Sequence, residues 1–156
     1  MIYTYFYDFP IGKVGIAETN GTISHVYFDD TTNKPKNTEM KETRLIKSCV
    51  AQLREYFDGK RTEFDLPLTL NGTEFQLKAW KALQEIPYGE VRSYKEQAIA
   101  VGNVKACRAV GMANNRNPIS IIVPCHRVVG HSGKLVGYGG GLPVKEYLLD
   151  MEKRCV

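Results

Sequence analysis

The sequence has no long hydrophobic run: no apolar stretch among its 156 residues approaches the roughly 20 residues that a membrane-spanning helix needs. The N-terminus, MIYTYFYDFPIGK, also lacks a basic start followed by a continuous apolar core, so no secretion signal is expected there. These absences predict a protein without membrane association that stays in the cytosol, or in a nucleus if its source has one. Because 43% of the residues are hydrophobic and 24% are charged, we expect a globular fold.

Cysteine patterns typical of metal sites are also missing. The four cysteines stand at 49, 107, 125 and 155, no two of them with CxxC spacing, and no histidine pair lies nearby to complete a zinc site. We therefore expect no metal and no cofactor. In a reducing compartment all four cysteines should be free thiols.

The balance of charge differs between the two halves of the chain. Residues 1–72 hold 9 basic and 10 acidic side chains, a net −1, whereas residues 73–156 hold 12 and 7, a net +5. A basic half is the footprint expected of a surface that meets phosphates. A solvated basic face without a partner has the same composition, so charge alone leaves both interpretations open.

Residues 1–72 are predicted to form a small α/β subdomain with a short antiparallel sheet. Segments rich in β-branched and aromatic residues predict strands at 2–9, 12–18, 22–28 and 64–70. A turn signal, Thr19-Asn20-Gly21, precedes the third strand, and the polar residues 29–38 predict a loop. Apolar residues at helical spacing predict a helix over about 44–57. Its buried face is expected to comprise Ile46, Cys49, Val50, Leu53 and Phe57.

Residues 73–156 are predicted to form a mainly helical domain, which makes the whole chain an α+β protein. The capping box Thr73-Glu74-Phe75-Gln76 starts a helix that runs to about Ile86, where Pro87-Tyr88-Gly89 ends it. Two short helices are expected next, at 93–101 with Ser93 as N-cap and at 104–114. Because a glycine joins them, they resemble a helix-turn-helix, although any αα-corner shows the same pattern.

The second of these short helices has two unlike faces. One face is apolar and is expected to pack inward, and it comprises Ala106, Ala109, Val110 and Ala113. The other is small and basic, and it comprises Lys105, Arg108, Gly111 and Met112. Small residues let a helix approach a nucleic-acid groove closely, whereas a solvated face is the neutral interpretation.

A cysteine follows an apolar, strand-like run near the centre of this domain. The run at 119–123 is closed by Pro124, and Cys125, His126 and Arg127 come directly after it. Neighbouring positive charge stabilises a thiolate, so this setting favours a nucleophilic cysteine. The alternatives are a Cys-His hydrolase, an alkyl acceptor and a buried inert thiol. Because neighbouring side chains on an extended chain point apart, Cys125 and His126 can cooperate only through an irregular turn or a bridging water.

The stretch Ile-Ile-Val-Pro-Cys-His-Arg-Val at 121–128 resembles the signature of the O6-alkylguanine-DNA alkyltransferases, also called methylated-DNA–protein-cysteine methyltransferases. The resemblance spans residues 75–153, whereas residues 1–72 are only loosely similar. Its further motifs, in the family's order, are Phe75-Gln76, Trp80, Ile86-Pro87-Tyr88-Gly89, Ser93-Tyr94, Arg108-Ala109-Val110-Gly111, Asn117-Pro118, Gly139-Gly140-Gly141-Leu142 and Lys145-Glu146.

The resemblance implies a repair protein that acts once. Cys125 would attack the alkyl carbon on guanine O6 and keep it as a thioether. His126 would take the thiol proton through a water, and Glu146 on the final helix would orient and charge-balance His126. Tyr94 would donate a proton or hydrogen bond to guanine N3, and Asn117 would brace the turn that carries the active-site segment.

The resemblance also implies a monomer that binds double-stranded DNA in the minor groove without sequence preference. The damaged nucleotide would be flipped out, with Arg108 filling the vacated place. Tyr138 would pack on the base, within a loop at 136–141. The other residues implied in substrate or DNA binding are Lys105, Ala109, Gly111, Arg127, Val128, Gly139 and Gly140. Some family members bind zinc through N-terminal Cys and His, but residues 1–48 hold no cysteine and only one histidine, so no metal is expected.

Two alternative functions remain. A non-catalytic protein that binds alkylated DNA would lack the acceptor cysteine, so the presence of Cys125 argues against that class. A helix-turn-helix regulator would explain the basic half of the chain, but not the Pro-Cys-His-Arg sequence.

Overall fold

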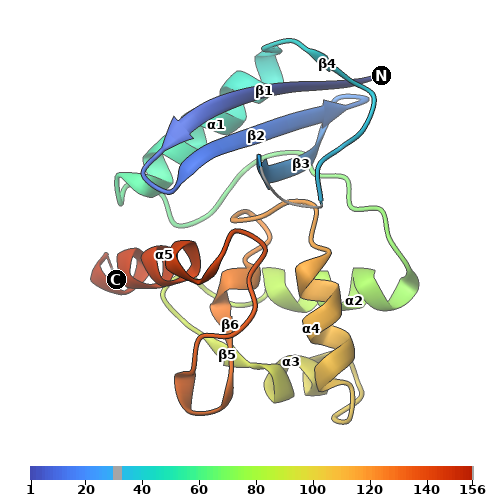
Figure 1. The fold of residues 1–156 in the computed structure, drawn as a ribbon, viewed down its shortest axis with the longest axis vertical. Coiled ribbons are helices and arrows are strands. Elements are labelled where there is room, and N and C mark those ends of the chain that lie inside the picture. Colours follow the sequence, from blue (N-terminus) through green and yellow to red (C-terminus); the bar gives the residue numbers. More distant parts are fainter. Residues whose placement is uncertain (30–32, 156) are drawn as a thin grey trace. The chain divides into compact units, whose positions relative to one another are not determined.

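Three antiparallel strands at the start of the chain form most of a four-stranded sheet (Figure 1). They are β1 (Ile2–Phe9), β2 (Gly12–Thr19) and β3 (Thr22–Phe28), and β4 (Thr38–Met40) pairs in parallel with β1. The computed structural model describes residues 1–29 and 33–155, so the predicted loop at 29–38 lies partly outside the described residues. The strands predicted at 2–9, 12–18 and 22–28 are confirmed. The short β4 is not predicted by the sequence because its residues are exposed and carry no apolar pattern.

The helix α1 (Arg44–Phe57) covers this sheet and has the predicted bounds. Thr43 caps its start by accepting a hydrogen bond from the Ile46 amide at 3.1 Å. Four of the five residues expected on its inner face are buried, whereas Phe57 is half-buried and Tyr56 is buried instead. Because Tyr56 and Phe57 are adjacent, the predicted buried face of α1 differs from the observed one by a single position.

The strand expected at 64–70 does not form. Only Leu68 makes an isolated bridge to Ile23, with the Ile23 amide bonded to the Pro67 carbonyl at 2.8 Å. Pro67 has no amide hydrogen, so the segment cannot build a continuous ladder. A later segment, residues 118–120, belongs to the same compact unit as residues 1–70, because Val26 exchanges backbone hydrogen bonds with Pro118 and Ser120.

The second compact unit comprises residues 71–117 and the chain from 121 onward. Its helices are α2 (Glu74–Gln84), α3 (Tyr94–Ala100), α4 (Cys107–Asn115) and α5 (Leu142–Arg154). Two short parallel strands, β5 (Arg92–Ser93) and β6 (Val128–Val129), pair with each other (Figure 1). The α+β fold class is confirmed, with a sheet-containing first unit and a mostly helical second one.

The helix starts in this unit follow from their caps. Thr73 and Gln76 form the predicted capping box of α2, and Ser93 caps α3 with Glu96 completing a second box. By contrast, α4 begins at Cys107 rather than near 104. The preceding residues make a turn instead, in which the Ala106 amide donates to the Asn103 carbonyl at 3.0 Å.

The centre of the helical unit is built from small residues. Its buried cluster comprises Ala79, Ala98, Ala106, Val110 and Ala113, which come from α2, α3 and α4 or their ends. Ala109 is exposed, so the expectation that it packs inward is wrong. The buried face of α4 runs through Val110, Ala113 and Asn114 instead. Within the described residues, no helix combines the length and apolarity required to cross a membrane.

Candidate active site

Cys125 lies on a tight turn rather than directly after a β-strand. The run expected to be extended at 119–123 breaks at Ile121, whose φ of 72° is in the left-handed region that β-branched residues rarely occupy. Cys125–Arg127 then form one turn of 3₁₀ helix. The strand expectation is therefore wrong, and Cys125 and His126 lie on an irregular turn.

Asn117 is the residue that holds this turn. It is almost fully buried, and its side-chain amide donates to the Val123 carbonyl at 2.7 Å. The Cys125 amide donates to the same carbonyl at 2.9 Å. The backbone before Cys125 is thus fixed by two donors, which stabilises the strained conformation at Ile121. This is the position that the expected bracing role of Asn117 requires.

His126 pairs with Glu152, not with Glu146. The His126 ring is fully buried, and its Nε2 lies 2.7 Å from the Glu152 carboxylate. Glu146 is exposed, so its expected contact with His126 is wrong. The two glutamates are six residues apart on α5, about one and two-thirds turns, and therefore point to different sides of the helix. The buried face of α5 carries Lys145, Leu148, Met151 and Glu152, and that helical spacing is the sequence signal that identifies the correct glutamate.

Arg127 is a second buried partner of Glu152. Its Nε and Nη2 atoms donate to the carboxylate at 2.8 and 3.1 Å, and its Nη1 donates to the Ile86 carbonyl at 2.8 Å. The guanidinium also lies 5.7 Å from the centre of the Tyr88 ring. An arginine held in this way cannot reach out to a phosphate, so the expected DNA contact of Arg127 is wrong. Its role is to fix the carboxylate that orients His126.

The protonation of this network follows from its burial. Burial alone would raise the pKa of Glu152, but hydrogen bonds and charge from His126 and Arg127 outweigh it and lower that pKa to about 2. Burial lowers the pKa of His126, and the hydrogen bond to Glu152 only partly offsets that effect. Near neutral pH, His126 is therefore uncharged and its Nε2 carries the proton donated to Glu152. The other ring nitrogen, Nδ1, has no hydrogen-bond partner within the described part of the chain and is left as an acceptor.

The Cys125 thiol is protonated at rest. Burial raises its pKa, while a side-chain hydrogen bond with Asn117 and the charge of Lys145 act in the opposite direction. Stabilisation of a thiolate by Arg127 is not what the structure provides, because that guanidinium is paired with Glu152. Since the thiol holds its proton, it can act as a nucleophile only if a base removes that proton. The adjacent residue, His126, carries a ring nitrogen that can accept it.

Lys145 is a buried cation that the sequence did not single out as a site residue. Its Nζ donates to the Val136 carbonyl at 2.9 Å, and the Tyr94 hydroxyl donates to the same oxygen at 3.1 Å. Lys145 also lies 5.9 Å from the centre of the Tyr94 ring. One backbone carbonyl of the 136–141 loop is thus shared by a residue of α3 and a residue of α5. A lysine beside a glutamate on a terminal helix looks solvent-exposed in sequence, and only the packing of α5 shows that it is not.

Two tyrosines lie close enough to Cys125 to respond to its charge. Burial raises the pKa of Tyr94, and a negative charge on Cys125 raises it further. Burial, and then the negative charges of Cys125 and Glu152, raise the pKa of Tyr138. Both phenols therefore keep their protons at neutral pH and can act as hydrogen-bond donors.

A shallow pocket lies beside Tyr94, and its lining includes several residues that the sequence predicts to be in the site. Its volume is about 340 Å³, and it is lined by Tyr94, Cys107, Arg108, Gly111, Asn115, Val136 and Gly137. Lys105, Ala109 and Gly139 are exposed, Gly140 is half-buried, and the Val128 side chain is fully buried. The expected binding residues therefore lie on or near α4 and the 136–141 loop, with the exceptions of Arg127 and Val128.

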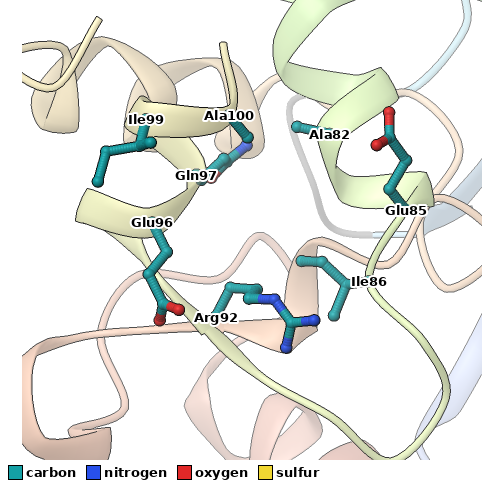
Figure 2. Close-up of a pocket in the computed structure, with 8 residues that line it drawn as sticks. All are labelled: Ala82, Glu85, Ile86, Arg92, Glu96, Gln97, Ile99 and Ala100. Carbon is teal, nitrogen blue, oxygen red and sulfur yellow. The ribbon is translucent and has the colours of Figure 1, made fainter. Parts of the chain in front are cut away.

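A larger hollow of about 480 Å³ lies between α2 and α3 (Figure 2). Figure 2 shows a lining of alanine and isoleucine side chains together with Glu85, Arg92, Glu96 and Gln97. None of the lining residues is a cysteine or a histidine, and Cys125 does not line this hollow.

Comparison with known proteins gives one consistent result. The family models described as the DNA binding domain and the ribonuclease-like domain of 6-O-methylguanine DNA methyltransferase match residues 74–154 and 1–70. The methylated-DNA–protein-cysteine methyltransferase of Mycolicibacterium paratuberculosis is 51% identical, over 94% of this chain and 90% of its own. The constitutive enzyme of that name from Bacillus subtilis is 47% identical, over 92% and 91%.

The solved structures agree with the sequence relatives. The crystal structure of Mycobacterium tuberculosis OGT in complex with DNA superposes with a TM-score of 0.93 at 46% identity, covering 98% of this chain and 94% of that one. The crystal structure of the O6-methylguanine methyltransferase of the same organism superposes with a TM-score of 0.92 at 45% identity, covering 100% and 95%.

Proposed function

The chain belongs to the 6-O-methylguanine DNA methyltransferase family, and we propose that Cys125 is the residue onto which it transfers the alkyl group of O6-alkylguanine in DNA. The activity is DNA repair by direct reversal, performed by a methylated-DNA–protein-cysteine methyltransferase. The observation that carries the assignment to Cys125 is its position next to a buried, uncharged histidine whose Nδ1 accepts no hydrogen bond from the described residues. Among the four cysteines, Cys125 alone has such a neighbour in the sequence.

The reaction is a single displacement at carbon. The Cys125 thiol loses its proton to His126 Nδ1 through a water, and the sulfur attacks the alkyl carbon. The new S–C bond forms as the bond from that carbon to guanine O6 breaks, and the electron pair stays with the guanine. Because the thioether has no step that regenerates the thiol, each molecule reacts once.

Tyr94 and Lys145 assist the departure of the guanine. Tyr94 keeps its proton at neutral pH and donates it, or a hydrogen bond, to guanine N3 as negative charge develops on the base. To do so its hydroxyl must leave the Val136 carbonyl, which Lys145 continues to hold at 2.9 Å. Lys145 also supplies the positive charge that favours the thiolate during attack.

DNA is bound by a monomer through α4, in the minor groove and without reading the sequence. A guanine inside a duplex cannot reach a buried thiol, so the nucleotide is flipped out and Arg108 occupies the vacated place. Arg108 is exposed at the rim of the small pocket, with Gly111 one turn further along the helix. Contacts to phosphates make this binding weaken with salt. The protein is proposed to act in the cytoplasm, where a bacterial or archaeal relative meets its DNA.

Replacing Arg108 with alanine is expected to slow repair of duplex DNA by about tenfold to a hundredfold. Extruding a base costs a few kcal/mol, and each ~1.4 kcal/mol of lost assistance is a factor of ten in rate. Reaction with free O6-methylguanine, which needs no flipping, should stay within about twofold of wild type. The measurement is single-turnover transfer to the protein from each substrate. Arg116→Ala is the matched control, since Arg116 is also exposed but lies outside the pocket, and equal losses on both substrates would remove the proposed role of Arg108.

The pH dependence of the transfer rate reports the base. His126 accepts a proton only when neutral, and burial lowers its pKa below the usual 6.5. The rate should therefore be level around neutral pH and fall only as the pH drops through an apparent pKa below about 6.5. A pH series of single-turnover rates on the free base checks this without a contribution from DNA binding. A rate that already declines between pH 8 and 7 would show that the essential base is not the buried His126.

A further inference from the structure

Two buried side-chain amides form a closed ring of hydrogen bonds between α3 and α4. Gln97 Nε2 donates to Asn114 Oδ1 at 2.8 Å, and Asn114 Nδ2 donates back to Gln97 Oε1 at 2.8 Å. The second hydrogen of Gln97 Nε2 goes to the Ala79 carbonyl of α2 at 3.2 Å. Gln97 is 2% exposed and Asn114 is 8% exposed. Figure 2 shows Gln97 on α3, among the side chains that line the hollow next to α2.

The apolar packing around this pair has little directional preference. The cluster where the three helices meet consists of alanines and one valine, with the larger Phe75 and Tyr94 only partly buried against it. Small side chains make shallow ridges, which interlock less than those of large side chains. Hydrogen bonds, by contrast, weaken steeply with misalignment. The amide pair and the 2.8 Å bond from Trp80 Nε1 to the Ala113 carbonyl are directional contacts that tie α4 to α3 and α2.

The pair connects the two helices that carry the proposed chemistry. Tyr94 is the first residue of α3, three positions before Gln97 and thus on the same side of that helix. Arg108 is six positions before Asn114 on α4, about 9 Å along the helix axis. A small rotation of α4 about its contact with α3 would change the distance between Arg108 and Tyr94. A displacement of about 1 Å is enough to slow a reaction that depends on the position of a flipped base.

We propose that Gln97 and Asn114 are positioning residues that hold Arg108 at the correct distance from Tyr94. The residue that assists base flipping and the residue that assists the departure of guanine then stay in a fixed relative position. This inference rests on the roles proposed above for Arg108 and Tyr94. The pair does not touch the substrate, and its contribution is to geometry rather than to stability. Well-packed apolar residues of similar size often replace a buried polar pair without loss of stability.

The test compares an apolar double variant with the wild type on two substrates. Gln97→Met/Asn114→Leu removes all three hydrogen bonds of the pair at nearly constant volume, and we expect it to fold with a melting temperature close to that of the wild type. Its single-turnover rate on duplex O6-methylguanine should fall about tenfold, whereas its rate on the free base should stay within about twofold. A folded double variant with the wild-type rate on duplex DNA would overturn the proposal, and so would an equal loss on both substrates.

A swapped pair keeps the test decisive even if the apolar variant does not fold. Gln97→Asn/Asn114→Gln preserves the total length of the two side chains and both hydrogen bonds between the helices. We expect its rate on duplex DNA to lie within about threefold of wild type, and a tenfold loss confined to duplex DNA would contradict a role for the hydrogen-bonded pair. Arg108→Ala separates this inference from the proposed function. If that variant loses duplex activity selectively and the amide variants do not, only the positioning role is wrong.

Discussion

Cys125→Ser is expected to abolish methyl transfer while leaving DNA binding intact. The hydroxyl is much less acidic and less nucleophilic than the thiol, so the rate should fall by on the order of a thousandfold or more. Serine is slightly smaller than cysteine and can keep the hydrogen bond with Asn117, so the turn at Cys125–Arg127 should persist. The measurements are transfer of a labelled methyl group from a duplex oligonucleotide, and binding of the same duplex by fluorescence anisotropy.

Cys107→Ser is the control for this substitution. Cys107 is half-buried at the start of α4 and lines the same pocket as Arg108, so it is the alternative thiol that a bound base could approach. It has no histidine neighbour, and its replacement should leave transfer nearly unchanged. Full transfer by the Cys125 variant, or loss of transfer in the Cys107 variant, would move the acceptor away from Cys125.

Glu152→Gln is expected to destabilise the fold by about 3 kcal/mol or more and to slow transfer at least about tenfold. The carboxylate accepts hydrogen bonds from His126 and Arg127 in a buried site, and from the Gly89 amide at 3.3 Å. A glutamine has one acceptor oxygen, and its amide group would face donors, so Arg127 would keep a buried charge without its partner. The proton on His126 would also no longer be held at Nε2, so Nδ1 would lose its role as acceptor.

Glu146→Gln is the matched control, because it makes the same chemical change on the same helix at an exposed position. It should alter neither the free energy of unfolding in urea nor the single-turnover rate. The opposite pattern, a large effect at Glu146 and none at Glu152, would contradict the arrangement of the site.

The same carboxylate makes stability depend on pH in a defined window. The folded protein keeps Glu152 ionised down to a pKa of about 2, whereas the unfolded chain protonates near the usual 4.5. Its stabilising contribution is therefore complete above about pH 4.5 and is lost as the pH falls toward 2. The difference in unfolding free energy between wild type and Glu152→Gln should shrink over this window.

The elements that could be predicted from the sequence are those with a local cause. The first three strands alternate or concentrate β-branched and aromatic residues, α1 has a clear apolar face, and α2 and α3 begin at side-chain caps. The turn before Cys125 could not be predicted, because Ile121 adopts a left-handed conformation that its own preference opposes and that Asn117 stabilises from outside the run.

Site residues that belong to a sequence motif could be predicted. Site residues whose contacts depend on helix packing could not. Cys125 and His126 follow from the Pro-Cys-His-Arg sequence, but the partner of His126 depends on which face of α5 is buried. Glu146 and Glu152 are chemically identical, and only the position of Leu148 and Met151 distinguishes them. Arg127 is expected from the sequence to stabilise a thiolate and to bind substrate or DNA, yet its burial against Glu152 makes it a structural residue.

The most direct test is intact-protein mass spectrometry after incubation with a duplex oligonucleotide that contains O6-methylguanine. We expect a gain of one methyl group per molecule, mapped to Cys125 and ending at one equivalent. An unchanged mass despite clear binding of the oligonucleotide would contradict it and would indicate a lesion-binding protein whose thiol does not react.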